Sequence, residues 1–323
     1  MVRIGTSGWS YPTGQGTWNG VFYPKPRPRG FDELAYYAEH FDTVEVNSTF
    51  YRVPEAAQVA TWVTRTPADF LFAVKLYQKF THPDMYLKQA GATEWRPSLV
   101  DIDVFRAGIE PLAAAGRLGA LLLQFPPSLH ASPAAGDYLS WLLDHLRAYP
   151  TVVELRHRSW FEVGGEAPAE TGGDLAARLR VTGAGLVVAD DPESAQMTSG
   201  VFFKDRATKK TPDVICAPLY LRLHGRNAAA WWHHAAAQDR YNYLYSPTEL
   251  RPFADQAQDA AAAGRRVFAF MNNHFSAKAV ANAAVLKSQL GQDLPGDYEP
   301  ELIDRYPDLQ GLVRVRASAP RLI

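Results

Sequence analysis

The sequence has one cysteine, almost no net charge and no long apolar run, and each absence excludes a class of protein. Cys216 alone cannot form an intramolecular disulfide or a thiolate metal cluster. The formal net charge is -1, from 33 basic and 34 acidic residues, which is not the basic excess of most nucleic-acid-binding proteins. No apolar run is long enough to span a bilayer, and the first residues show no signal-peptide pattern. We therefore expect a cytoplasmic protein that does not bind membranes. The charge also argues against nucleic acid as a partner but does not exclude it, because a local basic face can exist within a neutral average.

Motifs for common cofactors are also missing. The chain has no Gly-x-x-x-x-Gly-Lys phosphate loop, and its early glycines, between Gly5 and Gly20, do not fit a dinucleotide fingerprint. There is no His-Glu-x-x-His helix and no other tight spacing of metal ligands. We expect no resident cofactor, with a divalent metal as the weaker alternative.

The sequence does contain a repeated change from apolar to polar residues. Eight strand-length apolar runs alternate with helix-like stretches, and each run ends on residues that can do chemistry. The runs are 2–5, 43–46, 70–74, 118–123, 152–153, 186–189, 219–221 and 267–271. Strands that alternate with helices predict right-handed βαβ units and a parallel sheet. Eight units predict an α/β protein with the (β/α)8 TIM-barrel fold, in which active sites lie at the carboxyl ends of the strands.

The same pattern predicts the domain organisation. Residues 1–290 are expected to form a single barrel domain, and the Pro- and Asp-rich residues 291–323 a C-terminal extension packed on it. Residues 192–218 have no helical period, so we expect a loop in place of the sixth helix. Residues 77–97 are expected to be an inserted loop. Ser246 and Ser276 are expected to begin the last two helices of the barrel.

The alternation of side chains along a strand predicts which polar groups point into the barrel. Val44 and Val46 suit the face that meets the helices, so Glu45 and Asn47 are assigned to the interior. The same argument, applied to every strand, assigns ten side chains to the upper interior. They are Glu45, Asn47, Lys75, Gln124, Glu154, Arg156, Asp190, Arg222, His224 and Asn272.

Buried charges must pair, face water or bind a ligand, because an isolated charge in the interior costs several kcal/mol or more. One interpretation is a self-neutralising network that only closes the top of the barrel. The preferred one is an enzyme, of hydrolase or lyase type, acting on a small anionic or polar molecule that bears phosphate or carboxylate. Lys75, Arg156 and Arg222 would then hold the anion, and Glu45, Glu154 or His224 would move protons.

Two other functions remain open. The acids together with His224 are ligand types for a divalent ion, which allows a metal-dependent phosphoesterase or nuclease, although three inward cations compete with a metal. The same pocket would also serve a non-catalytic binding protein. Lys75 itself has two interpretations: an amine with a lowered pKa that forms a Schiff base, or a simple bridge to Glu45.

Four aromatic residues follow strand ends and, together with Phe50, are expected to line one mouth of the barrel, with loop packing as the alternative. They are Trp9, Tyr11, Tyr51 and Trp160. His82 is assigned to packing or to the surface.

Several segments, in order along the chain, carry a resemblance to a known family. They are 4–11, 18–24, 37–51, 124–128, 154–160, 220–225 and 272–274. The stretch 37–51, which contains Glu45 and Asn47, is close to a signature. Together they resemble the domain-of-unknown-function 72 family, also called YecE-like. The resemblance implies a TIM barrel and no settled activity, and it does not extend to 161–173, 192–218 or the tail after Gly291.

Overall fold

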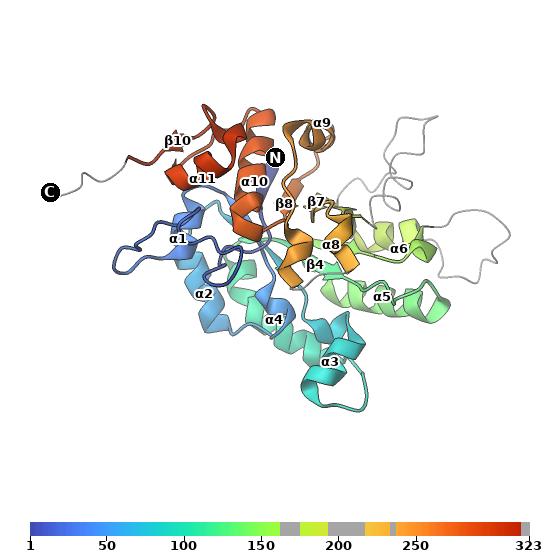
Figure 1. Ribbon diagram of the computed structural model, residues 1–323. Coiled ribbons are helices and arrows are strands. Elements are labelled where there is room, and N and C mark those ends of the chain that lie inside the picture. Colours follow the sequence, from blue (N-terminus) through green and yellow to red (C-terminus); the bar gives the residue numbers. More distant parts are fainter. Residues whose placement is uncertain (162–174, 193–216, 233–236, 318–323) are drawn as a thin grey trace, which may run out of the picture.

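The computed structural model describes residues 1–161, 175–192, 217–232 and 237–317. At its centre eight strands form one parallel sheet in the order β1-β8-β7-β6-β5-β4-β3-β2, surrounded by helices (Figure 1). The strands are β1 (Val2–Thr6), β2 (Thr43–Val46), β3 (Leu71–Lys75), β4 (Leu118–Gln124), β5 (Thr151–Glu154), β6 (Gly185–Asp190), β7 (Leu219–Leu223) and β8 (Val267–Met271). Just beyond β1, Ser7 forms a parallel bridge with Glu45, and this bridge brings the two outer strands together. The fold is the predicted (β/α)8 TIM barrel, nearly closed.

Helices lie between the strands along the chain and cover the outer face of the barrel (Figure 1). They are α1 (Glu33–Ala38), α2 (Ala56–Thr64), α3 (Pro83–Ala90), α4 (Leu99–Ala114), α5 (Pro133–Leu146), α6 (Leu175–Thr182), α8 (Ala228–Trp232), α9 (Pro247–Ala262) and α10 (Lys278–Gln289). None of the helices in the described ranges is both long and apolar enough to cross a bilayer. The predicted loop in place of the sixth helix, and the insert at 161–173, lie almost wholly outside the described residues.

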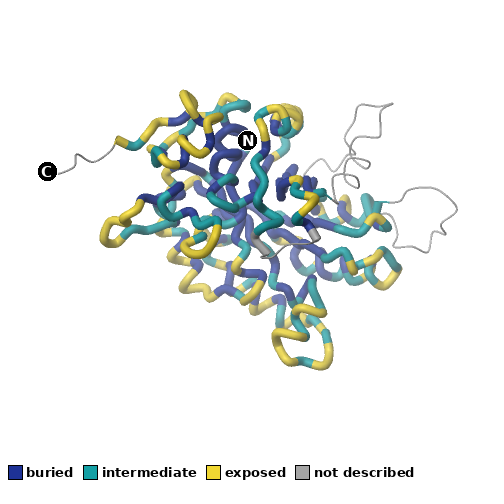
Figure 2. The backbone as a smooth tube through the Cα atoms, viewed as in Figure 1, coloured by how far each residue is buried: buried dark blue, intermediate teal, exposed yellow. Residues whose placement is uncertain are grey.

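The strands bury two separate apolar clusters, one on each face of the barrel. The inner cluster includes Ala73, Leu122, Val152, Tyr220 and Phe268. The outer cluster joins the other strand face to the helices, and Figure 2 shows the buried centre within a more exposed surface. These two clusters confirm the predicted parity of β3, β4, β5, β7 and β8.

Of the two predicted helix starts, one was confirmed and one was wrong, and the loop predicted at 77–97 was also wrong. Ser246 caps α9, and Glu249 returns a hydrogen bond to it, so the capping box is present. Ser276 is not the cap of α10: it has φ 52° inside a short 3-10 turn, and Ala277 (φ 61°) precedes the helix. The expected loop at 77–97 contains helix α3, which starts with Pro83 at its first turn and ends at Gly91 in the left-handed region.

Residues after α10 form a small layer over the side of the barrel. Strands β9 (Asp297–Tyr298) and β10 (Arg314–Val315) pair in parallel, and α11 (Pro300–Arg305) lies between them in the chain. The Tyr298 side chain is fully buried, and the Tyr306 hydroxyl donates a hydrogen bond to the Ser276 carbonyl, at 2.5 Å. The layer therefore packs on the start of α10, although the boundary at residue 290 stays a prediction.

Candidate functional site

Charged side chains from four strands meet at the carboxyl end of the barrel, directly above the inner apolar cluster. Arg222 on β7 is their centre and is 1% exposed. Its Nε and Nη2 donate to the two carboxylate oxygens of Glu45 on β2, at 2.9 and 2.8 Å. Its Nη1 donates to Oε2 of Glu154 on β5 at 2.6 Å and to Oε1 of Gln124 on β4 at 2.9 Å. One guanidinium thus ties three other strands to β7.

A second row of contacts continues from Glu154. Its other oxygen, Oε1, accepts from Nε of Arg156 at 2.6 Å. Nη2 of Arg156 lies 3.4 Å from Nε2 of His224, and Nδ1 of His224 lies 2.8 Å from the amide of Asn272. The guanidinium of Arg156 and Nδ2 of Asn272 both donate hydrogen bonds, and a neutral imidazole has one acceptor nitrogen, so His224 accepts from only one of them. The predicted inward position of Asn272 is confirmed.

Electrostatics fix the ionisation states of the acids in this network. Burial alone would raise the pKa of Glu45 and of Glu154, but the charge of Arg222 outweighs it and holds both below the ordinary value. Arg156 and His224 lower the pKa of Glu154 further. For His224, burial and then Arg222 and Arg156 depress the pKa well below its ordinary value. Near neutral pH the two acids are carboxylates and His224 is neutral.

The hydroxyl of Tyr220 supports Glu45 from below. It donates to Oε2 of Glu45 at 2.7 Å in a fully buried setting.

Tyr220→Phe removes this donor but leaves both bonds from Arg222, so we expect a loss of about 1–2 kcal/mol in the free energy of unfolding. Urea denaturation at pH 7 measures it, and Tyr149→Phe, whose hydroxyl receives a 3.4 Å bond from Arg106 near the surface, is the control. Equal stability of the two variants would contradict a structural role for the Tyr220 hydroxyl.

Lys75, at the end of β3, differs from the arginines because its side chain makes no hydrogen bond or ion pair with any of the described residues. The residue is partly exposed. Its ammonium nitrogen lies 4.1 Å from the centre of the Phe50 ring. No hydrogen bond or ion pair joins Lys75 to Glu45, whose carboxylate is bound by Arg222 and Tyr220, so the interpretation of Lys75 as a bridge to Glu45 is wrong. Burial, and then the charge of Arg222, lower the pKa of Lys75 to about 7.

His82, which sequence reasoning assigned to packing or the surface, lies at this site. Its ring meets the Phe50 ring edge-on, with centroids 4.8 Å apart. Burial lowers the pKa of His82 to about 3, and the charges of Lys75 and Arg156 contribute. His82 belongs to the segment 77–97, which was expected to be a loop. The one sequence signal for its place at the site was its position, seven residues after the end of β3.

The predicted inward position of Asp190 is wrong. Val187 and Ala189 of β6 lie beside Tyr220 and Arg222, whereas Asp190 lies beside Leu223 on the outer face. There it accepts bonds from Arg226 (2.9 Å, from Nε and from Nη2) and from the hydroxyl of Tyr245 (2.7 Å). Both alternating sets of β6 are apolar, so the pattern alone did not decide the parity.

The parity argument missed Asp191, the residue that follows Asp190. Asp191 is 1% exposed, and its charge contributes to raising the pKa of Arg156. The signal was present in the sequence, because Asp190 and Asp191 are adjacent and a shift of one residue exchanges them.

The remaining predicted residues divide between the mouth and the surrounding packing. Asn47 follows β2 and has a buried side-chain oxygen with no hydrogen-bond partner in the described ranges. Tyr11 stacks on His274 (centroids 4.4 Å apart), and Tyr51 is 58% exposed. Trp9 packs edge-on against Trp62 of α2, with centroids 5.8 Å apart.

Trp160 is also held in the packing. It is 7% exposed and donates from Nε1 to the Leu129 carbonyl at 2.8 Å. For Trp9 and Trp160 the geometry is that of loop packing, and a ligand role for any of the four aromatic residues stays a prediction.

A parallel barrel with a charged network at the carboxyl ends of its strands places the protein in the class of TIM-barrel proteins. A family model described as "Protein of unknown function DUF72" matches residues 3–302. The chain therefore belongs to the DUF72 family, as the resemblance implied.

Relatives and solved structures agree with that membership. The chain is 26% identical over 300 residues to the UPF0759 protein YunF of Bacillus subtilis, covering 92% of this chain and 97% of YunF. It is 30% identical over 167 residues to the UPF0759 protein YecE of Escherichia coli K12, about half of each chain (51% and 52%).

Two crystal structures have the same fold. A DUF72 family protein from Thermotoga maritima is 30% identical, with a TM-score of 0.64, and the match covers 90% of this chain and all of that one (100%). A DUF72 family protein from Enterococcus faecalis is 22% identical with a TM-score of 0.67, and the match covers 90% and 96% of the two chains.

Proposed function

We propose that the protein is an enzyme that uses the carboxyl end of the barrel to bind a small anionic or polar molecule bearing carboxylate or phosphate. Lys75 would be the group that exchanges a proton with the ligand or attacks it. Arg156, which is partly exposed, would hold the ligand's negative charge. The observation that carries the proposal is Lys75, a partly exposed residue whose amine makes no hydrogen bond or ion pair with the described residues, in a site where the acids are already bound by arginines.

The ionisation states support this distribution of roles. An amine with a pKa of about 7 is a base and a nucleophile near neutral pH, whereas an ordinary lysine is almost fully protonated. The carboxylates of Glu45 and Glu154 have pKa values below the ordinary range and are hydrogen-bonded to Arg222. We therefore assign Glu45 and Glu154 to positioning the arginines, not to the proton transfer first expected of them.

The contacts give less support to a metal-dependent phosphoesterase. Each oxygen of Glu45 and Glu154 accepts a bond from an arginine, so a divalent ion at the same oxygens would compete with a guanidinium for them. In the described ranges no three His, Cys, Asp or Glu side chains are grouped as metal ligands. The cytoplasm as compartment and a small molecule as partner, in place of nucleic acid, stay predictions.

Binding of small anions is the direct test. Isothermal titration with inorganic phosphate and with a series of small mono- and dicarboxylates should detect a ligand for the wild-type protein. Lys75→Met and Arg156→Met should each weaken that binding about tenfold or more, because a hydrogen bond to a charged group contributes about 1.5–3 kcal/mol. Lys79→Met is the matched control, since Lys79 is bound to Asp101 at 2.6 Å. Unchanged affinity in Lys75→Met and Arg156→Met would remove both residues from the site.

Proton transfer separates an enzyme from a binding protein that uses the same pocket. Proton NMR in D2O would follow deuterium uptake at the carbon next to the carbonyl of small 2-oxo acids such as pyruvate. An enzyme using Lys75 as a base should catalyse uptake that Lys75→Met abolishes and Lys79→Met retains. Tight binding of the same compounds without uptake would favour the non-catalytic alternative.

A further inference from the structure

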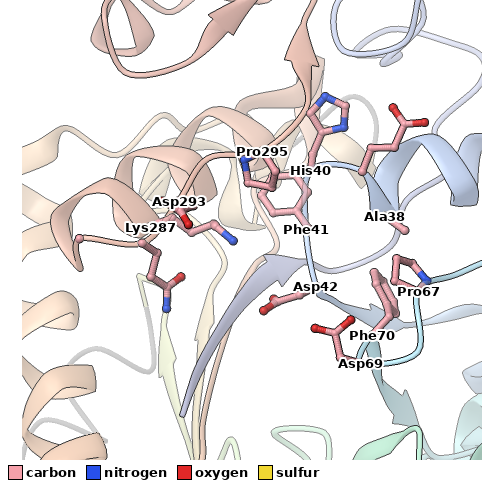
Figure 3. Close-up of a pocket in the computed structure, with 13 residues that line it drawn as sticks. Ala38, His40, Phe41, Asp42, Pro67, Asp69, Phe70, Lys287, Asp293 and Pro295 are labelled. Atoms are coloured by element: carbon pink, nitrogen blue, oxygen red, sulfur yellow. The ribbon is translucent and has the colours of Figure 1, made fainter.

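A cavity lies at the opposite end of the barrel from Lys75. It has a volume of about 540 Å³, within the range of small-molecule sites. Its walls come from the residues that enter β2 and β3, among them Asp42 and Asp69, and from the end of α10 and the segment after it, with Lys287 and Asp293 (Figure 3). In TIM barrels this end normally serves stability, so polar groups there are expected to be paired.

Lys287, in the last turn of α10, does not meet that expectation. Only 5% of the residue is exposed, and its side chain makes no hydrogen bond or ion pair with any of the residues that the structure describes. Figure 3 shows its side chain reaching into the cavity from the α10 side. Burial lowers the pKa of Lys287, and the negative charges of Asp42 and Asp293 offset this only in part. A carboxylate brought by a ligand would stabilise the buried ammonium further.

On the other side of the cavity an acceptor is also unused. Asp42 is bound through Oδ2 to Nη1 of Arg3, at 2.9 Å, but its Oδ1 is buried without a hydrogen-bond partner in the described ranges. Asp69 lies near the same Arg3 nitrogen, at 3.8 Å, and is 75% exposed. This side of the cavity therefore offers negative charge and an open acceptor to a donor group.

From these two unsatisfied sides we propose that the cavity binds a small zwitterion of the amino acid or dipeptide class. The carboxylate of the ligand would pair with the ammonium of Lys287, and its ammonium group would donate to Oδ1 of Asp42, with Asp69 adding negative charge at the rim. A ligand with one charge would satisfy only one side. This site is separate from the proposed reaction at the other end of the barrel, and neither proposal depends on the other.

The first test needs no ligand. Methionine has a stem close to that of lysine but no charge, so Lys287→Met should fold and should melt at a higher temperature than the wild-type protein. The physical reason is that the variant no longer buries an unpartnered ammonium group. The same change at the other end of the helix, Lys278→Met, removes a bond to Asn242 and should not raise the melting temperature. A lower melting temperature for Lys287→Met would show that Lys287 has a structural partner and would overturn the proposal.

The second test uses dipeptide probes on the full chain. Alanyl-alanine carries both an ammonium and a carboxylate group. Its N-acetyl form keeps only the carboxylate, and its C-terminal amide keeps only the ammonium. Isothermal titration should show that the zwitterion binds about tenfold or more tighter than either capped form. Lys287→Met should remove the preference over the C-terminal amide, which lacks only the carboxylate, and Lys278→Met should keep it. Absence of binding by alanyl-alanine and by the free amino acids, binding of the capped forms as tight as that of the zwitterion, or an affinity for alanyl-alanine unchanged by Lys287→Met would each overturn the proposal.

Discussion

Arg222→Met should lower the free energy of unfolding by about 3–5 kcal/mol, the cost of removing one partner from a buried ion pair. The variant leaves the carboxylates of Glu45 and Glu154, both at most 1% exposed, without the guanidinium that binds them. Gln124 loses its donor as well. Urea denaturation at pH 7 measures the change.

A surface pair provides the matched control. Arg251 lies 2.9 Å from Asp255 on α9, with more than half of each side chain exposed (58% and 54%). Arg251→Met should cost less than about 1 kcal/mol, because exposed ion pairs contribute little. Similar losses in the two variants would contradict the view that Arg222 compensates buried charge.

The pH dependence of the Arg222→Met deficit has a definite sign. In the wild-type protein the folded pKa values of Glu45 and Glu154 are lowered, so their contribution is complete above the ordinary carboxyl pKa and is lost as pH falls through the folded values. Without Arg222, burial instead favours protonation of the two acids. The difference between wild type and variant should therefore be largest near neutral pH and should shrink in acid.

The fold was predictable because one pattern, an apolar run that ends in polar residues, occurs eight times along the chain. An apolar run ending in polar residues needs no partner to be recognised, so the strands and most helices were found from the chain alone. Parity also worked where one alternating set was clearly apolar, as with Glu45 between Val44 and Val46. It failed on β6, where Leu186 and Val188 are as apolar as Val187, and a choice of one residue exchanged Asp190 for Asp191.

Pairing within the site could not be read from the sequence. Three inward bases and a similar number of acids are compatible with many ion-pair arrangements, and only the distances decide that Arg222 binds both Glu45 and Glu154. Lys75 was therefore left without an acid, and of its two interpretations the bridge to Glu45 was wrong. The buried Lys287 gave no signal either, because a lysine in the last turn of a helix is an ordinary feature.

Lys75→Met should make the protein more stable than wild type at pH 6, and the advantage should disappear as pH rises toward 10. The folded pKa of Lys75 is about 7, whereas the ordinary value is 10.5. Between these two values the unfolded chain binds more protons than the folded one, so the stability of the wild-type protein rises with pH relative to the variant. Below pH 7 the lysine is protonated in both states, and the cost of holding an unpartnered ammonium group beside Arg222 is fully present.

Thermal denaturation of both proteins from pH 6 to pH 10 measures this difference, and groups common to both cancel. Lys79→Met should give the opposite sign at pH 6, because the pKa of Lys79 is raised by its bond to Asp101 and its pairing stabilises the fold. A constant difference between Lys75→Met and wild type across this range would mean that the lysine has an ordinary pKa. In that case the barrel would hold no neutral amine near pH 7, and the reaction proposed for this site would lack its base.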